Sequence, residues 1–172
     1  KSGVKRVVIG MVDPNPLNNG KGVQILGLHK IKVTVGVLED ELRRMNEAFI
    51  KFIVKRMPLV TVKVAQSLDG KIATRTGESQ WISSDMSRNF SHRLRQYFDA
   101  VIVGVNTVRR DNPRLDAWFA RRQPIKIVVD SQLSTPEDAR IFEQSSKVIL
   151  VTLPVRPGQE TPNRKVLAAK AR

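Results

Sequence analysis

VTVKVAQSLDGKIATRTGESQWISSDMSRNFSHRLRQYFDAVIVGV, residues 60 to 105, is the stretch that decides the fold. It opens with alternating valines, which predict a strand over Leu59–Ala65. It closes with AVIVGV (Ala100–Val105), an apolar run without alternation that is typical of a strand buried on both faces. Between them lie a long polar loop and a helix that Ser83 or Ser84 can cap.

Two further strands are predicted downstream, over Ile125–Asp130 and Lys147–Thr152, and both are apolar in the same way. Strands that alternate with helices indicate an α/β domain with a largely parallel sheet. The carboxyl ends of parallel strands meet at one sheet edge, where open α/β sheets bind ligands. Polar loops with hydroxyl groups follow each of the first three predicted strands, so we expect a binding site at that edge.

The first 57 residues have a separate, shorter pattern. Short strands are predicted over residues 4–9 and 31–37, with a helix over Val23–Leu28 between them and an amphipathic helix over Glu39–Lys55 after them. Two strands and two helices are too few to form an independent hydrophobic core, so we expect these residues to be part of a larger domain. Pro58 cannot continue the helix and marks the predicted boundary.

The composition narrows the class of protein. The chain has 172 residues, no cysteine and a net charge of +14. A disulfide or thiolate metal site is therefore excluded, and the lack of a long apolar run predicts a cytoplasmic protein without a membrane partner. The positive charge is spread over both parts and only 5% of residues are aromatic, so a phosphorylated small molecule is favoured over nucleic acid as partner.

Several kinds of catalytic site are not supported. His29 and His92 are the two histidines, far apart in the sequence, and no HExxH, GxSxG, GxGxxG or P-loop motif is present. We therefore expect no metal site. Lys63 interrupts an apolar strand; it is either a snorkelling surface lysine or a cleft lysine that meets an anion. Trp81 is either a packing residue or a platform for a flat ring.

Three segments together resemble the reductase domain of the bifunctional riboflavin-biosynthesis deaminase/reductase family: VTVKVAQSLDGKIATRTGESQWISS, VIVGVNTVRRDNPRL and IKIVVDSQLSTP. Residues 3 to 53 are similar to the end of the deaminase domain of the same family. The resemblance implies a dihydrofolate-reductase-like fold for residues 58–172, preceded by a remnant of a cytidine-deaminase-like α/β domain in residues 1–57. It also implies a homodimer.

The resemblance further implies an activity. NADPH would reduce the ribosyl group of 5-amino-6-(5-phosphoribosylamino)uracil to a ribitylamino chain. By position, the residues implied in NADPH binding are Ala65, Trp81, Thr107, Asp111 and Ser131. Those implied in binding the phosphorylated substrate are Ser79, Arg95 and Leu115, and Lys63 is implied to reach the ribose.

The sequence also departs from that family. Trp118 stands where members often have a second phosphate-binding arginine, a role that Arg114, Arg121 or Arg122 could take. In that family zinc is bound by deaminase motifs (HxE and PCx…C), which this chain lacks, so we expect no deamination. The chain also lacks the later Glu-Gly-Gly segment of the family, so we expect a truncated reductase domain. The alternatives are a stand-alone reductase of another pyrimidine or pterin, a non-catalytic NADPH- or phosphate-binding fragment, and a basic nucleic-acid-binding protein.

Overall fold

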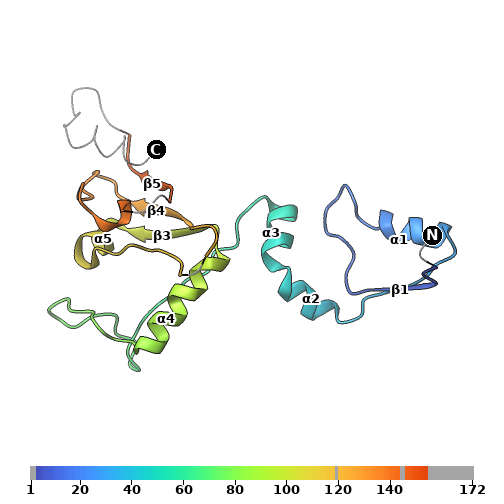
Figure 1. Ribbon diagram of the computed structural model, residues 1–172, viewed down its shortest axis with the longest axis horizontal. Coiled ribbons are helices and arrows are strands. Elements are labelled where there is room, and N and C mark those ends of the chain that lie inside the picture. The colour runs from blue at the N-terminus through green and yellow to red at the C-terminus, as the bar shows by residue number, and fades with distance from the viewer. Residues whose placement is uncertain (1–2, 119, 144–145, 155–172) are drawn as a thin grey trace. The chain divides into compact units, whose positions relative to one another are not determined.

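The computed structural model describes residues 3–118, 120–143 and 146–154. Contacts divide the chain into two compact units, Lys1–Val64 and Ala65–Arg172 (Figure 1). The domain boundary at Pro58 lies a few residues before this division and stays a prediction.

The first unit contains a two-stranded parallel sheet. Strands β1 (Arg6–Ile9) and β2 (Lys32–Val35) pair in parallel, and helix α1 (Lys21–Leu28) lies between them in the chain. A parallel pair needs a crossover connection, usually a helix, because the chain must return to the start of the first strand. These three elements confirm the predicted strand–helix–strand order.

The single helix predicted over Glu39–Lys55 is two helices. They are α2 (Glu39–Met45) and α3 (Glu47–Lys55), which meet at Asn46. The side-chain Nδ2 of Asn46 donates a hydrogen bond to the carbonyl oxygen of Leu42 over 2.8 Å. An asparagine side chain that bonds to nearby backbone groups competes with helix geometry, and this explains the interruption.

The second unit is built on a three-stranded parallel sheet in the order β3–β4–β5, seen side by side in Figure 1. The strands are β3 (Ala100–Gly104), β4 (Ile125–Val129) and β5 (Val148–Val151). They confirm three of the predicted strands, and the parallel sheet with helices between its strands confirms the predicted α/β class.

The helices of this unit are short. Ser84 caps the first of them, because its Oγ accepts a hydrogen bond of 3.3 Å from the backbone N–H of Ser87, which confirms the predicted cap. The helical elements are α4 (Asp85–Leu94), the 3₁₀ turn η1 (Arg95–Tyr97), α5 (Val105–Asp111) and the 3₁₀ turn η2 (Arg140–Phe142).

One face of the sheet carries the core of the second unit. Val128 and Ile141 are fully buried, and Val108, Leu115 and Ala139 complete their cluster. Strand β4 contributes Val128 from its centre, while α5 and the turns after it contribute the other members. The core therefore fixes the positions of the loops that follow β3 and β4.

The opposite face of the sheet is exposed. Ile102, Val129 and Val151 are 62%, 51% and 47% exposed, respectively. The prediction that these strands are buried on both faces is wrong for the described chain, because these three apolar side chains on the opposite face remain largely open to solvent. An apolar sequence without alternation therefore did not distinguish one covered face from two.

The strand predicted over Leu59–Ala65 does not form in the described chain. Val60, Val62 and Val64 are 69%, 79% and 55% exposed, and the segment has no helix or strand assignment. A strand exists only when a neighbouring strand takes up its backbone hydrogen bonds. No such neighbour lies beside this segment among the described residues, so its alternating valines remain without a sheet.

Candidate active site

The loop between Ala65 and α4 contains two turns of the same design. In each, the hydroxyl oxygen of the first residue, Ser67 or Thr74, accepts a hydrogen bond of 3.0 Å from the backbone N–H of the fifth residue. The fourth residue is a glycine with a positive φ, 80° at Gly70 and 86° at Gly77, a conformation that glycine adopts without strain. SLDGK and TRTGE are thus one turn motif used twice, and the loop is well structured rather than a loose connector.

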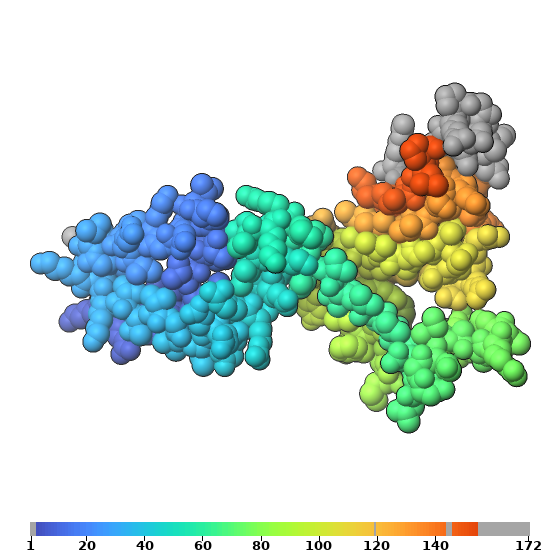
Figure 2. All heavy atoms as spheres, turned by 180° about the vertical axis from the view of Figure 1, so that it is seen from behind, coloured from blue at the N-terminus to red at the C-terminus, as the bar shows by residue number. Residues whose placement is uncertain are grey.

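This loop lies at the surface of its unit, where it is seen in green in Figure 2. Its second turn contacts α5: a Cβ added at Gly77 would lie 3.2 Å from Nη1 of Arg110. Trp81, near the end of the loop, is 70% exposed, and the guanidinium of Arg88 lies 4.2 Å from the centre of its ring. Trp81 is therefore not a core packing residue; its ring carries the Arg88 guanidinium and is otherwise largely open to solvent, and its role as a ligand platform stays a prediction.

Two of the predicted binding loops share one edge of the sheet. Gly104 pairs with Val129 at the carboxyl ends of the parallel strands β3 and β4. Thr107 and Asp111, both exposed, belong to the helix that follows β3, and exposed Ser131 follows β4. The start of α5 and the loop after β4 thus bring the hydroxyls of Thr107 and Ser131 near the edge where open parallel sheets bind ligands, whereas Asp111 lies at the far end of α5.

Asp130 shapes the loop after β4. Its carboxylate is buried and accepts hydrogen bonds from the backbone N–H of Thr135 (2.8 Å), the hydroxyl of Thr135 (2.6 Å) and the hydroxyl of Ser134 (3.2 Å). Burial alone raises the pKa of Asp130, but these hydrogen bonds outweigh it and leave the pKa below the ordinary value of 3.8. The ionised form is therefore the one that holds the Ser131 loop in shape.

Replacing Asp130 with asparagine is expected to lower the free energy of unfolding by about 1–3 kcal/mol at neutral pH, because an amide accepts these hydrogen bonds less strongly than a carboxylate. Because its pKa is lowered by folding, Asp130 contributes to the stability of the wild-type protein. This contribution is fully present above the unfolded-state pKa and is lost as the pH falls through the folded-state pKa. The difference in unfolding free energy between the two proteins should therefore become smaller as the pH falls below 3.8, the ordinary pKa of an aspartate. Urea unfolding at neutral and acid pH measures it, with the exposed Asp138→Asn as control.

Arg95 is the centre of a second group of polar residues. One nitrogen, Nη1, contacts Nδ1 of His92 over 2.9 Å and donates to the backbone carbonyl of Asp116 over 3.1 Å. Burial lowers the pKa of Arg95, and the carboxylate of Asp116 opposes this change. The imidazole of His92 stacks on Trp118 with ring centres 4.1 Å apart. His92 is therefore part of a packed cluster rather than a free surface side chain.

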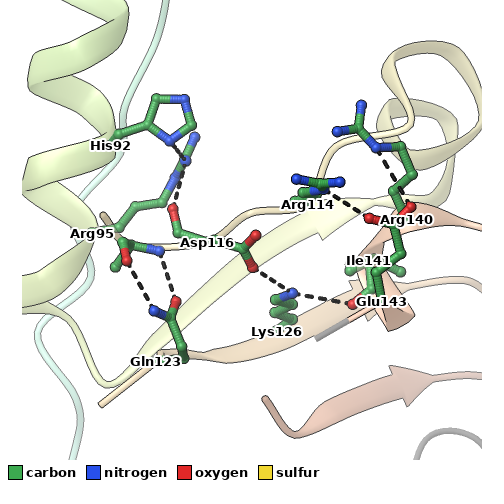
Figure 3. Close-up of polar contacts among 10 residues, drawn as sticks. His92, Arg95, Arg114, Asp116, Gln123, Lys126, Arg140, Ile141 and Glu143 are labelled. Carbon is green, nitrogen blue, oxygen red and sulfur yellow. Dashed lines mark hydrogen bonds and ion pairs between the residues drawn. The ribbon is translucent and has the colours of Figure 1, made fainter. Parts of the chain in front are cut away.

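The backbone that holds Arg95 is itself fixed by buried side chains (Figure 3). Lys126 is 0% exposed, and its Nζ lies 2.8 Å from the carboxylate of Asp116 and donates to the carbonyl of Ile141 over 3.1 Å. The side-chain amide of Gln123 bonds Ala117 twice: it accepts from the N–H over 2.8 Å and donates to the carbonyl over 2.9 Å. The Arg95 guanidinium is thus held by a chain segment with little freedom to move.

The other four residues that the resemblance implies in ligand binding lie in different parts of the structure. Lys63 is exposed and belongs to the first unit, Ala65 begins the second unit, and Ser79 is half-buried in the loop. Leu115 is buried in the core with a φ of 57°, so a ligand would meet its backbone rather than its side chain. Within the described part of the second unit, Arg95 forms no hydrogen bond with Ala65, Ser79 or Leu115.

Of the three arginines that could act beside Arg95, one is already paired. The Nε of Arg114 lies 2.7 Å from a carboxylate oxygen of Glu143, an ion pair that directs it to η2. Arg121 and Arg122 are exposed in the turn that precedes β4. Trp118 packs on His92 instead of offering a charge.

Sequence reasoning missed the residues that support the site: Asp116, Gln123, Lys126 and Asp130. A signal existed for one of them, because Lys126 interrupts an apolar strand just as Lys63 does. The other three pair with groups 4 to 10 residues away, in turns and loops without a repeating pattern, so the sequence alone does not show those pairings. The described residues contain no group of three or more histidine, aspartate or glutamate side chains that could hold a metal ion. Within the same residues, no helix is both long and apolar enough to cross a membrane.

A family model and individual protein sequences both relate this chain to the RibD proteins. The family model for the RibD C-terminal domain matches residues 58–167. The riboflavin biosynthesis protein RibD of Aquifex aeolicus is 46% identical over 155 residues, which are 88% of this chain and 44% of that protein. RibD of Synechocystis is 42% identical over 154 residues, 88% of this chain and 42% of that protein. The chain therefore spans less than half the length of these relatives.

Solved structures show the same similarity in three dimensions. A diaminohydroxyphosphoribosylaminopyrimidine deaminase/5-amino-6-(5-phosphoribosylamino)uracil reductase of Thermotoga maritima has a TM-score of 0.80 and 38% identity, covering 94% of this chain and 46% of that chain. RibD of Acinetobacter baumannii has a TM-score of 0.80 and 35% identity, covering 98% of this chain and 47% of that one.

Proposed function

Since the chain belongs to the RibD C-terminal domain family, we propose that it acts as the reductase in riboflavin biosynthesis. The substrate is 5-amino-6-(5-phosphoribosylamino)uracil, whose ribosyl group is reduced at C1′ to a ribitylamino chain. The proposal is supported by the similarity to the Thermotoga maritima protein, which is named as this reductase. The match of the family model begins at residue 58, at the proposed start of the reductase domain.

The observation that carries the proposal is the setting of Arg95. Its Nη1 is used by His92 and Asp116, while Nε and Nη2 have no hydrogen-bond partner among the described residues. A guanidinium with free N–H groups, held by a fixed backbone, suits the phosphate of a sugar phosphate through paired charge-assisted hydrogen bonds. Ser79 and the backbone of Leu115 are the further substrate contacts that we assign, and Lys63 is assigned to the ribose.

The cofactor that we assign is NADPH, and the residues present fit it. Trp81 offers an exposed ring, and Thr107 and Ser131 offer exposed hydroxyls near the carboxyl edge of the sheet. Asp111, at the end of α5, offers an exposed carboxylate as an acceptor for hydroxyl groups. Ala65 completes the set without adding a polar side chain. When bound, NADPH supplies the hydride. The part left to these residues is to hold and orient the two ligands, which accounts for the structured turns of the loop.

Four further assignments rest on the same premise. We assign a cytoplasmic location and a homodimer to the protein, and light scattering on the purified chain measures the second. Zinc and deaminase activity are assigned only to the zinc-binding part of a deaminase domain, whose motifs are not in this sequence. The residues before Pro58 are assigned to the end of such a domain.

Turnover tests the proposal. The folded chain is mixed with NADPH and 5-amino-6-(5-phosphoribosylamino)uracil, and loss of the reduced-nicotinamide absorbance is compared with the amount of ribitylamino product. Equal amounts are expected, with much slower reaction of the dephosphorylated substrate. Oxidation of NADPH by a dihydropterin but not by the ribosylaminouracil would contradict the proposal and favour a reductase of another class.

A further inference from the structure

The contact between His92 and Arg95 fixes how the imidazole is protonated. An arginine side chain has only N–H donors, so Nδ1 of His92, 2.9 Å from Nη1 of Arg95, must be the acceptor. The neutral imidazole then carries its proton on Nε2. Burial lowers the pKa of His92, the positive charge of Arg95 lowers it further, and Asp116 opposes both effects. The net direction favours this neutral form, which donates from Nε2.

The orientation of the ring is fixed as well. The imidazole lies on the Trp118 ring with an angle of 13° between the planes and 4.1 Å between the centres. His92 comes from α4, while Trp118 comes from the segment between α5 and β4 that Gln123 holds at Ala117. Two elements distant in the sequence therefore clamp the imidazole, and its Nε2–H points in a defined direction.

The donors that remain in this cluster are next to one another. Among the described residues, Nε2 of His92 has no hydrogen-bond partner, and the same holds for Nε and Nη2 of Arg95. The nearest carboxylate, on Asp116, is taken up by Lys126 at 2.8 Å (Figure 3). The two acceptors within the cluster, Nδ1 of His92 and the backbone carbonyl of Asp116, are both used by Nη1 of Arg95. The other N–H donors of the two side chains are left for a ligand, which is the arrangement that an anion requires.

We propose that His92 is a second ligand of the phosphate that Arg95 binds, with its Nε2–H donating to a phosphate oxygen and Trp118 holding the imidazole in place. The inference rests on the proposed function, because it takes the Arg95 guanidinium as the phosphate site. The ligand class is a sugar phosphomonoester, which distinguishes it from the phosphates of the dinucleotide at the edge of the sheet. His92 then both positions Arg95 through Nδ1 and binds the ligand through Nε2.

Three substitutions of His92 separate these two roles. His92→Asn retains a polar group near the place of Nδ1 but loses the donor at Nε2. His92→Gln places an amide N–H near the place of Nε2 and loses the acceptor for Arg95. His92→Phe keeps a ring that stacks on Trp118 and loses both nitrogens. Urea unfolding of each variant checks that the fold is retained, and the probe is ribose 5-phosphate, titrated calorimetrically into the whole chain.

The expected result is that His92→Phe and His92→Asn weaken ribose 5-phosphate binding roughly tenfold to a hundredfold, the usual loss for a hydrogen bond to a charged group. His92→Gln should retain more affinity than His92→Asn. Ribose without the phosphate and inorganic phosphate serve as two further probes; the variants should leave the weak binding of ribose unchanged and reduce that of phosphate. NADPH affinity should not change.

Other outcomes overturn the inference in distinguishable ways. If His92→Asn binds like wild type while His92→Gln is weak, His92 only orients Arg95. If the variants weaken NADPH instead of ribose 5-phosphate, the cluster serves the dinucleotide. If all His92 variants bind ribose 5-phosphate normally while Arg95→Gln does not, this inference fails and the proposed function stands. If neither wild type nor any variant binds ribose 5-phosphate, the phosphate site itself is refuted, and with it both proposals.

Discussion

Replacing Lys126 with methionine is expected to lower the free energy of unfolding of the second unit by about 3–5 kcal/mol, because it leaves the buried carboxylate of Asp116 without its charge partner. Lys126 is 0% exposed, and its ammonium contact of 2.8 Å is an ion pair with Oδ1 of Asp116 that lacks hydrogen-bond geometry. Among the described residues, no other group forms a hydrogen bond or an ion pair with this oxygen. Urea unfolding followed by the fluorescence of Trp118 measures the loss, in a Trp81→Phe background that leaves one tryptophan.

Two companion variants make this prediction specific. Lys147→Met is the matched control, since Lys147 is exposed at the start of the neighbouring strand and should lose less than about 0.5 kcal/mol. Lys126→Met combined with Asp116→Leu removes both charges and should recover most of the stability, because a buried ion pair is often replaceable by apolar side chains of similar volume. A single variant as stable as wild type would show that the pair is not a support of the fold.

Replacing Arg95 with glutamine is expected to weaken the binding of the phosphorylated substrate roughly 100-fold, since two charge-assisted hydrogen bonds to the phosphate are lost. The NADPH affinity should stay within about twofold of wild type, because the cofactor residues are separate from this cluster. Binding of ribose 5-phosphate and of NADPH, both followed by calorimetry, measures the two effects in one preparation.

The helix supplies a control for Arg95. Arg93 lies two residues earlier, is exposed and points to a different side of the helix, so Arg93→Gln removes the same charge without touching the cluster. Its binding of ribose 5-phosphate should remain close to that of wild type. A comparable loss in both variants would mean that general positive charge, rather than the guanidinium held by Asp116 and His92, attracts the ligand.

The sequence predicts the sheet of the second unit well, because β3, β4 and β5 are short apolar runs bounded by turn residues. The cap at Ser84 is equally local, since it depends on one hydroxyl at the start of a helix. By contrast, the strand expected over Leu59–Ala65 depends on a partner strand. The uncovered sheet face around Ile102 depends on packing. A local sequence pattern shows neither whether a strand has a partner nor whether a sheet face is covered.

The same distinction holds for the site. Arg95 and Trp81 are found through the resemblance of the quoted motifs, but what holds Arg95 is not. The partners of its guanidinium are a backbone carbonyl at Asp116 and an imidazole at His92, and Asp116 is in turn held by Lys126 from the sheet. A charged residue within an apolar strand, as at Lys126, is the one part of this support that a sequence can reveal.

The measurement that tests the central claim most directly is a titration of the chain with NADPH, followed by tryptophan fluorescence. The chain has two tryptophans, so Trp81→Phe and Trp118→Phe assign the signal. We predict saturable quenching that persists in Trp118→Phe and disappears in Trp81→Phe, because Trp81 is the exposed ring platform of the loop. No saturable change up to millimolar NADPH, with circular dichroism showing a folded chain, would contradict the assignment of a reductase site to this protein.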